Sequence, residues 1–385
     1  MKKVAIFTGL DIRVYGGGET YAINLANELI NSGNFCAEIF SPVGKRTHFR
    51  NSLENIKKLT AVGISFFSAP EIPILQERFP LTISGLKTMS KMRNYDVIYN
   101  EDPSLMTNFM LLIVSKIYKK RMIFALHNPY YLRSTPLKGS ALRKIGLSIY
   151  RFFMYSVLMS IPNIHTINYY DRQTLIGMGY NKNIYEIPNW VTIEQNQNNK
   201  SVSKDFVVLS VGRLQIYQKG IDFLCKIIES AVRKNPSIKF HIVGSGDDGR
   251  QEISKVARKY RKNVVATGFL SEEKLKCEYS NASLYIMTSR FEGHPVALLE
   301  AQSCGLPAVA FAVKGVTDII ANKEQGSLVK QFDIEQFSDE ICTYYKAWKK
   351  RKILYNAKKK NIVKIIKSRY GREIIIPKIL KMFDS

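Results

Sequence analysis

Residues 289–309 read S-R-F-E-G-H-P-V-A-L-L-E-A-Q-S-C-G-L-P-A-V, and the rest of the chain is organised around them. The apolar run before them, 282–288, predicts a buried strand. Residues 296–303 are rich in Ala and Leu without Gly or Pro, so they predict a helix, which Pro295 can begin. A strand, a Gly/Pro turn and a helix in succession form the repeating unit of an α/β sheet.

Two carboxylates frame this unit, Glu292 in the turn and Glu300 on the helix. A helix N-terminus attracts anions, because its first N–H groups are unpaired and its dipole is positive there. Glu292 would repel phosphate alone, but it could accept hydrogen bonds from sugar hydroxyls beside a phosphate. Glu300, about two helical turns further on, could hold a second polyol such as a ribose. The simpler alternative is an ordinary turn with a helix-capping and a surface glutamate.

The segment from Glu292 to Val309 resembles the E-x7-E segment of the retaining glycosyltransferases of the GT-B fold, family 4. The resemblance covers nearly the whole chain and is most specific over 206–320. It implies an α/β, GT-B architecture with two Rossmann-like domains facing across a cleft and a C-terminal helix returning to the N-terminal domain. The second domain would hold most of the nucleotide-sugar.

The length of 385 residues indicates two domains. Together with the resemblance, it predicts an acceptor-side domain at 1–190, a nucleotide-sugar-binding domain at 191–365 and the returning helix at 366–385. The polar residues 194–204 predict a linker.

Short apolar strands alternate with helices, which predicts parallel, doubly wound sheets that bind ligands beyond the carboxyl ends of their strands. In the first half, a glycine-rich loop with Gly16 and Gly17 follows the first strand, and glycine lets backbone approach a ligand closely. His127 follows a strand at 122–125. A lone histidine at a strand end is more often structural than functional.

In the second half, Arg213 and Lys219 bracket a loop between a strand and a helix, where two cations can neutralise a diphosphate. Two surface cations in a basic protein are the alternative. The sequence G-S-G-D-D-G from Gly244 to Gly249 fits the dinucleotide fingerprint literally. Its aspartates would face a pyrophosphate, so we interpret it as a turn beside the nucleoside.

The resemblance implies a role for each matching residue. Arg213 and Lys219 would bind the donor diphosphate, which Gly16 and Gly17 would approach from the first domain. Glu300 would hold the ribose hydroxyls.

Two residues are expected to be catalytic by the same resemblance. Glu292 would hold the donor sugar, and His127 would lie near that sugar and the acceptor. The donor sugar and phosphates would also contact the turn and helix start, namely Gly293, His294, Pro295, Val296 and Ala297. Residues 314–318 depart from the family's G-G-x-x-E.

The implied reaction is retaining transfer of a hexose from a nucleotide-sugar, with a UDP-sugar as the expected donor. The two cations and the helix N-terminus would stabilise the charge of the leaving diphosphate. The acceptor hydroxyl would attack from the same face of the sugar. No D-x-D occurs in the sequence, so we expect neither a metal ion nor a cofactor.

The net charge is +25, and residues 103–170 contain no acidic residue. A second basic stretch, 346–381, contains one acid, Glu373. Such surfaces attract anionic membrane or nucleic acid, although a charge run is often only a solvated face. No nucleic-acid-reading signature is present. We therefore expect an anionic membrane surface as a partner, and a lipid-linked oligosaccharide, a glycolipid or a surface-polysaccharide precursor as the acceptor.

Five scattered cysteines without C-x-x-C spacing indicate reduced thiols. The apolar segment 145–161 contains Arg151 and stops at Pro162, so it predicts a buried or interfacial helix instead of a span. We expect a cytoplasmic protein, peripheral on the inner face of the plasma membrane. The alternatives are a nucleotide-sugar epimerase of the same fold and, from another class, a nucleic-acid-binding protein.

Overall fold

Apolar strands alternate with helices through the part of the chain that the computed structural model describes. This part is residues 1–385 without 10, 13–16, 44–62, 69–70, 73–76, 79–81, 128–140, 193–204 and 351. The chain folds into two units: unit 1 comprises Met1–Ile187 with Lys378–Ser385, and unit 2 comprises Pro188–Pro377. The predicted linker at 194–204 and the predicted loop residue Gly16 lie outside the described residues.

Unit 1 contains a seven-stranded parallel sheet whose inner strands are buried on both faces, as is typical of a doubly wound architecture. Across the sheet the strands are β3 (Gly63–Phe67), β2 (Phe35–Pro42), β1 (Lys2–Phe7), β6 (Val97–Asn100), β7 (Arg121–Leu126), β8 (Asn163–Thr166) and β9 (Asn183–Glu186). The helices are α1 (Gly17–Asn31), α3 (Ile83–Lys91), η2 (Met92–Asn94), α4 (Leu105–Ile117), α5 (Ala141–Ser160) and α6 (Tyr169–Gly177). A short antiparallel pair, β4 (Glu71–Ile72) and β5 (Glu77–Arg78), stands apart from this sheet.

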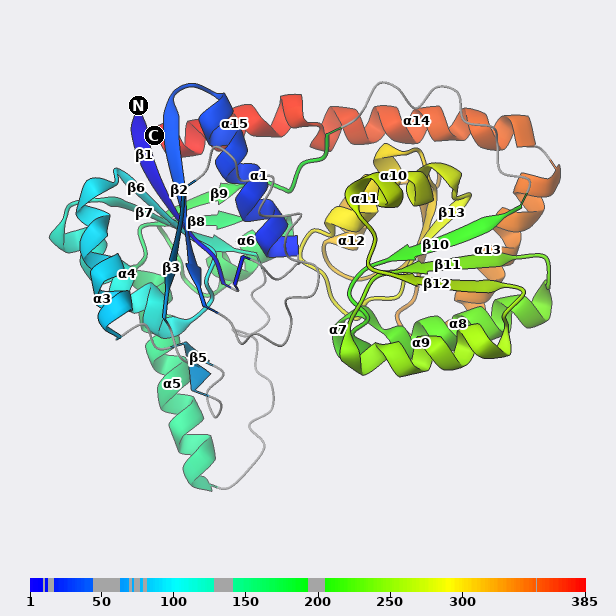
Figure 1. Ribbon diagram of the computed structural model, residues 1–385, viewed down its shortest axis with the longest axis horizontal. Helices are drawn as coiled ribbons and strands as arrows, with labels where there is room; N and C mark the ends of the chain where they lie inside the picture. Colours follow the sequence, from blue (N-terminus) through cyan, green and yellow to red (C-terminus); the bar gives the residue numbers. More distant parts are fainter. Residues whose placement is uncertain are drawn as a thin grey trace. The chain divides into compact units, whose positions relative to one another are not determined.

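The last helix, α15 (Arg372–Asp384), ends in unit 1, where the two ends of the chain lie side by side (Figure 1). Lys2 Nζ pairs with the Asp384 carboxylate at 2.8 Å. Phe383 is fully buried, with its ring centroid 5.4 Å from that of Tyr99. The end of α15 is therefore part of the core of unit 1.

Unit 2 contains a six-stranded parallel sheet. Its strands, in order across the sheet, are β12 (Val264–Gly268), β11 (Lys239–Val243), β10 (Val207–Val211), β13 (Leu284–Met287), β14 (Ala308–Phe311) and β15 (Gly326–Val329). Its helices are α7 (Ile216–Lys219), α8 (Ile221–Lys234), α9 (Asp247–Lys259), α10 (Glu272–Asn281), α11 (Val296–Ser303), α12 (Val316–Ile319), α13 (Ile334–Lys350) and α14 (Lys352–Tyr370). In α8 the buried side chains Leu224, Ile227, Ile228 and Ala231 recur at helical spacing, so one face packs on the core.

Two observed boundaries differ from the predicted ones. The chain enters unit 2 at Pro188, earlier than predicted, because Asn189 Nδ2 donates to the backbone carbonyl of His294 at 2.7 Å. The last helix begins at Arg372 instead of residue 366, because α14 continues to Tyr370 before Gly371 interrupts the helix.

The predicted apolar helix at 145–161 corresponds to α5. Among the described residues, no helix combines the length and the hydropathy that crossing a membrane requires.

Candidate functional site

The carboxyl ends of β10 and β13 bring the predicted donor residues of unit 2 together. A small cavity at this edge is lined by residues 210–214 and Lys219, among others, so it contains both predicted cations, Arg213 and Lys219. The turns there are in close contact: Gly244 has a φ of +141°, and a Cβ atom on it would lie 1.8 Å from the carbonyl oxygen of Gly212. Gly244 therefore has a packing role at this edge that the motif alone does not reveal.

Glu292 lies in the turn after β13 and is 7% exposed. Its Oε1 accepts hydrogen bonds from Lys219 Nζ and from Ser289 Oγ, each at 2.6 Å. Within the described part of the chain, no group donates to Oε2. The structure thus joins two residues for which the sequence predicted separate roles, Lys219 on the diphosphate and Glu292 on the sugar.

Arg290, two positions before Glu292, joins this turn to α7, the short helix that ends at Lys219. Its guanidinium forms a two-point ion pair with Asp222, at 2.9 and 2.7 Å, and also donates to the carbonyl oxygen of Ile216 at 2.5 Å. Burial alone would raise the pKa of Asp222, but the hydrogen bonds and charge of Arg290 hold that pKa below its usual value. Neither residue was predicted from the sequence, although Arg290 lies within residues 289–309.

The turn leads directly into α11. Pro295 caps this helix, and the first N–H groups come from Val296 and Ala297, which have no intrahelical carbonyl to bond. Gly315 has a φ of +80°, and a Cβ atom on it would lie 2.0 Å from the carbonyl oxygen of Gly293. Segment 314–318, which departs from the family pattern, therefore packs on the backbone of the turn.

Glu300 lies on α11, where Tyr279 of α10 orients it. The Tyr279 hydroxyl donates to Glu300 Oε2 at 2.8 Å, and burial raises the pKa of that tyrosine well above its usual value. The phenol therefore stays protonated and keeps donating. Tyr279 was not predicted, since a tyrosine on a separate helix carries no signal of this contact.

His294 is 4% exposed and packs its ring against Tyr370, with the centroids 5.0 Å apart. Burial, followed by the nearby charge of Arg369, lowers the pKa of His294 to about 3, so the imidazole is neutral. Neither ring nitrogen has a hydrogen-bond partner among the described residues. A neutral imidazole can donate one bond and accept one, which matches the chemistry of a sugar hydroxyl.

At the equivalent edge of the sheet in unit 1, His127 follows β7, and Gly17 is the first residue of α1. The His127 ring contacts the rings of Tyr21 and His165, with centroids 4.8 and 5.7 Å away. Burial, then the neighbouring His165, lowers the pKa of His127 to about 3. Its Nε2 is enclosed without a hydrogen-bond partner among the described residues.

The hydrogen bonds of His165, the third ring of this cluster, fix its tautomer. Its Nε2 lies 2.7 Å from the carbonyl oxygen of Ile187, and a carbonyl can only accept, so Nε2 carries the hydrogen. Burial lowers the pKa of His165 to about 4, so the ring is neutral and Nδ1 accepts from the hydroxyl of Tyr99 at 2.8 Å. Neither residue was predicted, because both lie inside ordinary strand sequences.

Glu101, directly after β6, is a further polar residue at this edge that the sequence did not single out. Burial, then the charge of Glu19, raises the pKa of this carboxyl well above its usual value. Its Oε1 is enclosed and has no partner among the described residues.

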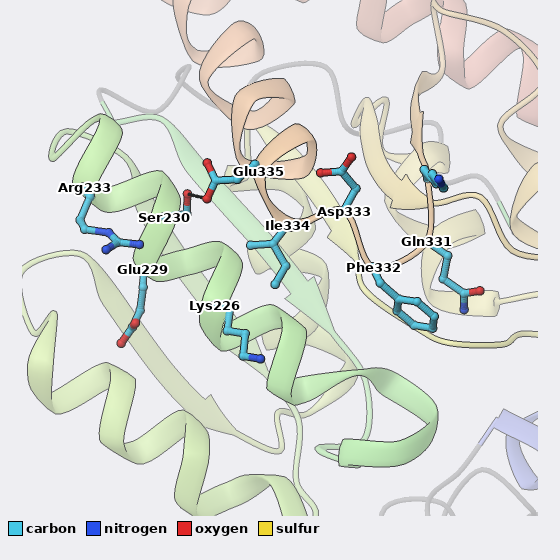
Figure 2. A pocket seen from close by; sticks show the side chains of 10 residues that line it. Lys226, Glu229, Ser230, Arg233, Gln331, Phe332, Asp333, Ile334 and Glu335 are labelled. Carbon is cyan, nitrogen blue, oxygen red and sulfur yellow. Dashed lines mark hydrogen bonds between the residues drawn. The ribbon is translucent and has the colours of Figure 1, made fainter.

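A larger cavity, of about 650 Å³, lies elsewhere in unit 2. Figure 2 shows Lys226, Glu229 and Arg233 along α8, with the loop of Gln331, Phe332 and Asp333 and the start of α13 on the other side. Glu335, in the first turn of α13, accepts a hydrogen bond from Ser230 of α8 at 3.1 Å. None of the predicted site residues lines this cavity. We therefore assign the site in unit 2 to the strand edge.

The chain matches two family models. Residues 15–195 match the model described as Glycosyltransferase Family 4, and residues 191–361 match the model described as Glycosyl transferases group 1.

Several glycosyltransferases are similar to this chain in sequence. An uncharacterized glycosyltransferase of Haemophilus influenzae is 26% identical over 87% of this chain and 88% of its own length. The poly(ribitol-phosphate) alpha-N-acetylglucosaminyltransferase of Staphylococcus aureus is 28% identical over 53% of this chain and 40% of its own. The amylovoran biosynthesis glycosyltransferase AmsD of Erwinia amylovora is 27% identical over 69% of this chain and 72% of its own.

Solved structures share the fold at low identity. HepE of Anabaena, in complex with UDP, superposes with a TM-score of 0.75 at 16% identity, covering 100% of both chains. Sucrose-phosphate synthase of Thermosynechococcus elongatus gives 0.76 at 16% identity, covering 100% of this chain and 98% of its own.

Proposed function

Since this chain is a glycosyltransferase of the GT-B fold, we propose that it moves a hexose from a UDP-sugar to a lipid-linked oligosaccharide, a glycolipid or a surface-polysaccharide precursor. The family matches confirm the predicted fold class and transferase activity. The observation that carries the donor proposal is the ion pair between Lys219, at the end of α7, and Glu292, in the turn before α11. Arg213 lies between β10 and α7 and lines the same small cavity as Lys219. Cations, a helix N-terminus and a buried carboxylate then meet at one strand edge.

Each of these groups would bind a different part of the donor. The diphosphate would bind Arg213, Lys219 and the first N–H groups of α11, while the sugar hydroxyls would donate to Glu292. His294 would add a hydrogen bond to the sugar, and Glu300 would accept from the ribose. That HepE is solved with UDP supports the choice of nucleotide.

The proposed chemistry retains the anomeric configuration. The bond between the anomeric carbon and the diphosphate oxygen breaks, and a bond from that carbon to the acceptor oxygen forms on the same face. The acceptor proton passes to a donor phosphate oxygen. Positive charge from Arg213, Lys219 and α11 stabilises the leaving diphosphate, so the reaction needs no metal ion. The catalytic role of His127 rests on the resemblance and on its unpartnered Nε2.

The acceptor proposal draws on the relatives and on charge. Relatives named for poly(ribitol-phosphate) glycosylation and amylovoran biosynthesis support an acceptor in surface-glycan assembly. The charge of +25 and the acid-free stretch 103–170 support a place at an anionic membrane surface, on its cytoplasmic side.

A donor screen in the presence of EDTA tests this function. We expect one of UDP-glucose, UDP-galactose and UDP-GlcNAc to stabilise the protein, and Arg213→Ala and Glu292→Ala to abolish the effect. Stabilisation by GDP-mannose alone would contradict the proposed nucleotide. Arg233→Ala, a matched cation in the larger cavity, should leave it intact. No stabilisation by any donor, or a requirement for a divalent metal, would refute the proposal. An epimerase would instead convert the nucleotide-sugar without an acceptor, which product analysis detects.

A further inference from the structure

Helix α5 of unit 1 carries large apolar side chains on its outward face. Ile149, Phe152 and Phe153 recur at helical spacing and are 60%, 70% and 54% exposed. Figure 1 shows α5 projecting from the rest of unit 1. The opposite face is buried through Met154 and Leu158. The outward face of the described part of α5 thus carries these large apolar side chains beside Ser148 and Ser156, and the opposite face packs on the protein.

This arrangement departs from the usual helix at a water-facing surface, where the outward face is polar. Single exposed apolar residues are common on protein surfaces, but two adjacent phenylalanines that are each more than half exposed are unusual. The neighbouring helix α4 repeats the feature, since Phe109, Ile113 and Ile117 form an outward stripe on it. Together they indicate a surface that meets an apolar phase.

The positive charge around these helices indicates which kind of partner this surface binds. Lys116, Lys119 and Lys120 lie at the end of α4, and no acidic residue occurs anywhere in 103–170. A second copy of this chain would set these cations against one another. An anionic lipid leaflet offers phosphates for the cations and acyl chains for the apolar side chains.

We propose that α5 lies in the interface of an anionic bilayer, with Ile149, Phe152 and Phe153 inserted among the acyl chains and the lysines of α4 at the headgroups. This deepens the proposed function, on which it rests for the nature of the acceptor: the enzyme would work where a lipid-linked acceptor is anchored. Insertion and purely electrostatic binding predict different effects of salt on membrane binding. Electrostatic binding vanishes in salt, whereas apolar insertion persists.

Sedimentation with vesicles of phosphatidylglycerol and phosphatidylcholine separates the two contributions. At about 0.5 M NaCl, where surface charges are largely screened, we expect the wild type to keep measurable binding. Ile149→Ser, Phe152→Ser and Phe153→Ser combined should weaken that remainder at least about tenfold. Val265→Ser with Leu328→Ser, which removes exposed apolar surface from unit 2, should not change it.

A fluorescent reporter tests insertion directly. The native tryptophans, Trp190 and Trp348, are each 9% exposed and both belong to unit 2, so they supply a constant background. Phe152→Trp should shift its emission to the blue on vesicles and be quenched by lipids brominated in the acyl chain. Val265→Trp, exposed on unit 2, should show neither change.

Three outcomes would overturn the proposal: no binding in high salt, equal binding of the triple variant, or an unquenched Phe152→Trp. A dimer in solution that the triple variant dissociates would assign the face to self-association instead. Stabilisation by the donor, measured on the triple variant, shows that it is folded. If no donor binds while insertion is observed, the membrane surface stands and the proposed function fails.

Discussion

Lys219 and Glu292 lie 73 positions apart in the sequence, yet the lysine Nζ stands 2.6 Å from the glutamate Oε1. The two residues belong to different strand–helix units, and Ser289 donates to the same carboxylate oxygen. A diphosphate that binds Lys219 would share its ammonium group with Glu292, since an ammonium has three N–H donors. Phosphate binding and the position of the carboxylate are thus linked through one side chain.

This linkage predicts that the two residues act as a unit. Glu292→Gln and Lys219→Met should each lower kcat/KM by roughly 100- to 1000-fold, the size of loss seen when one transition-state contact is removed. The double variant should lose far less than the product of the single losses, because each change already breaks the pair. Steady-state rates of all three variants decide this. Losses that multiply would show that the residues act independently.

Arg290 is expected to position Glu292 without touching substrate. Arg290→Lys should lose the two-point ion pair with Asp222, at a cost of roughly 1–3 kcal/mol in stability. It should raise KM for the donor about tenfold with a smaller change in kcat, since the turn then no longer holds Glu292 in position. Arg233→Lys serves as the control. A stability loss with KM unchanged would limit Arg290 to a structural role.

His294 predicts a pH-dependent stability that one substitution removes. Its pKa is about 3 in the fold and about 6.5 when unfolded, so between these values only the unfolded chain is protonated. The free energy of unfolding therefore falls as pH drops below about 6.5, by at most about 1.4 kcal/mol per pH unit from this residue.

His294→Phe should abolish that contribution, because the aromatic ring remains and the titration disappears. The difference in unfolding free energy between variant and wild type, measured in denaturant from about pH 7 to about pH 5, should grow in favour of the variant as the pH falls. A difference that is constant with pH would mean that the pKa of His294 is the same in the folded and the unfolded chain.

The contact between Tyr279 and Glu300 predicts that loss of the Tyr279 hydroxyl weakens binding of the nucleoside and not of the diphosphate. Tyr279→Phe removes the hydroxyl that orients Glu300 and keeps the buried ring, at a cost of about 1 kcal/mol in binding. The affinity for UDP should therefore fall several-fold. Binding of inorganic pyrophosphate, which has no ribose, provides the internal control and should stay the same. Equal weakening of both ligands would place the effect on the diphosphate instead.

The sequence predicts well what depends on neighbours along the chain. The strand before Ser289, the cap at Pro295 and the helix carrying Glu300 all follow from local composition, and the structure has each of them. The motif also identified Arg213 and Lys219 as lying at the same strand edge.

Contacts between distant segments could not be predicted. The pairing of Arg290 with Asp222 spans 68 positions, and that of Tyr279 with Glu300 joins two helices. Neither leaves a periodic or compositional trace. The start of the last helix was misplaced for a similar reason, since only the fold shows that Gly371 separates two helices.

The contribution of α15 to unit 1 has a consequence for how the protein is made on the ribosome. The first 187 residues emerge before any of unit 2, but Phe383 at the end of the chain is a buried part of their core. At about 5–20 residues per second, the last segment of unit 1, Lys378–Ser385, is synthesised on the order of ten seconds or more after residue 187. During that time the nascent chain exposes an unfinished core, so the demand for chaperones falls on the half that is translated first.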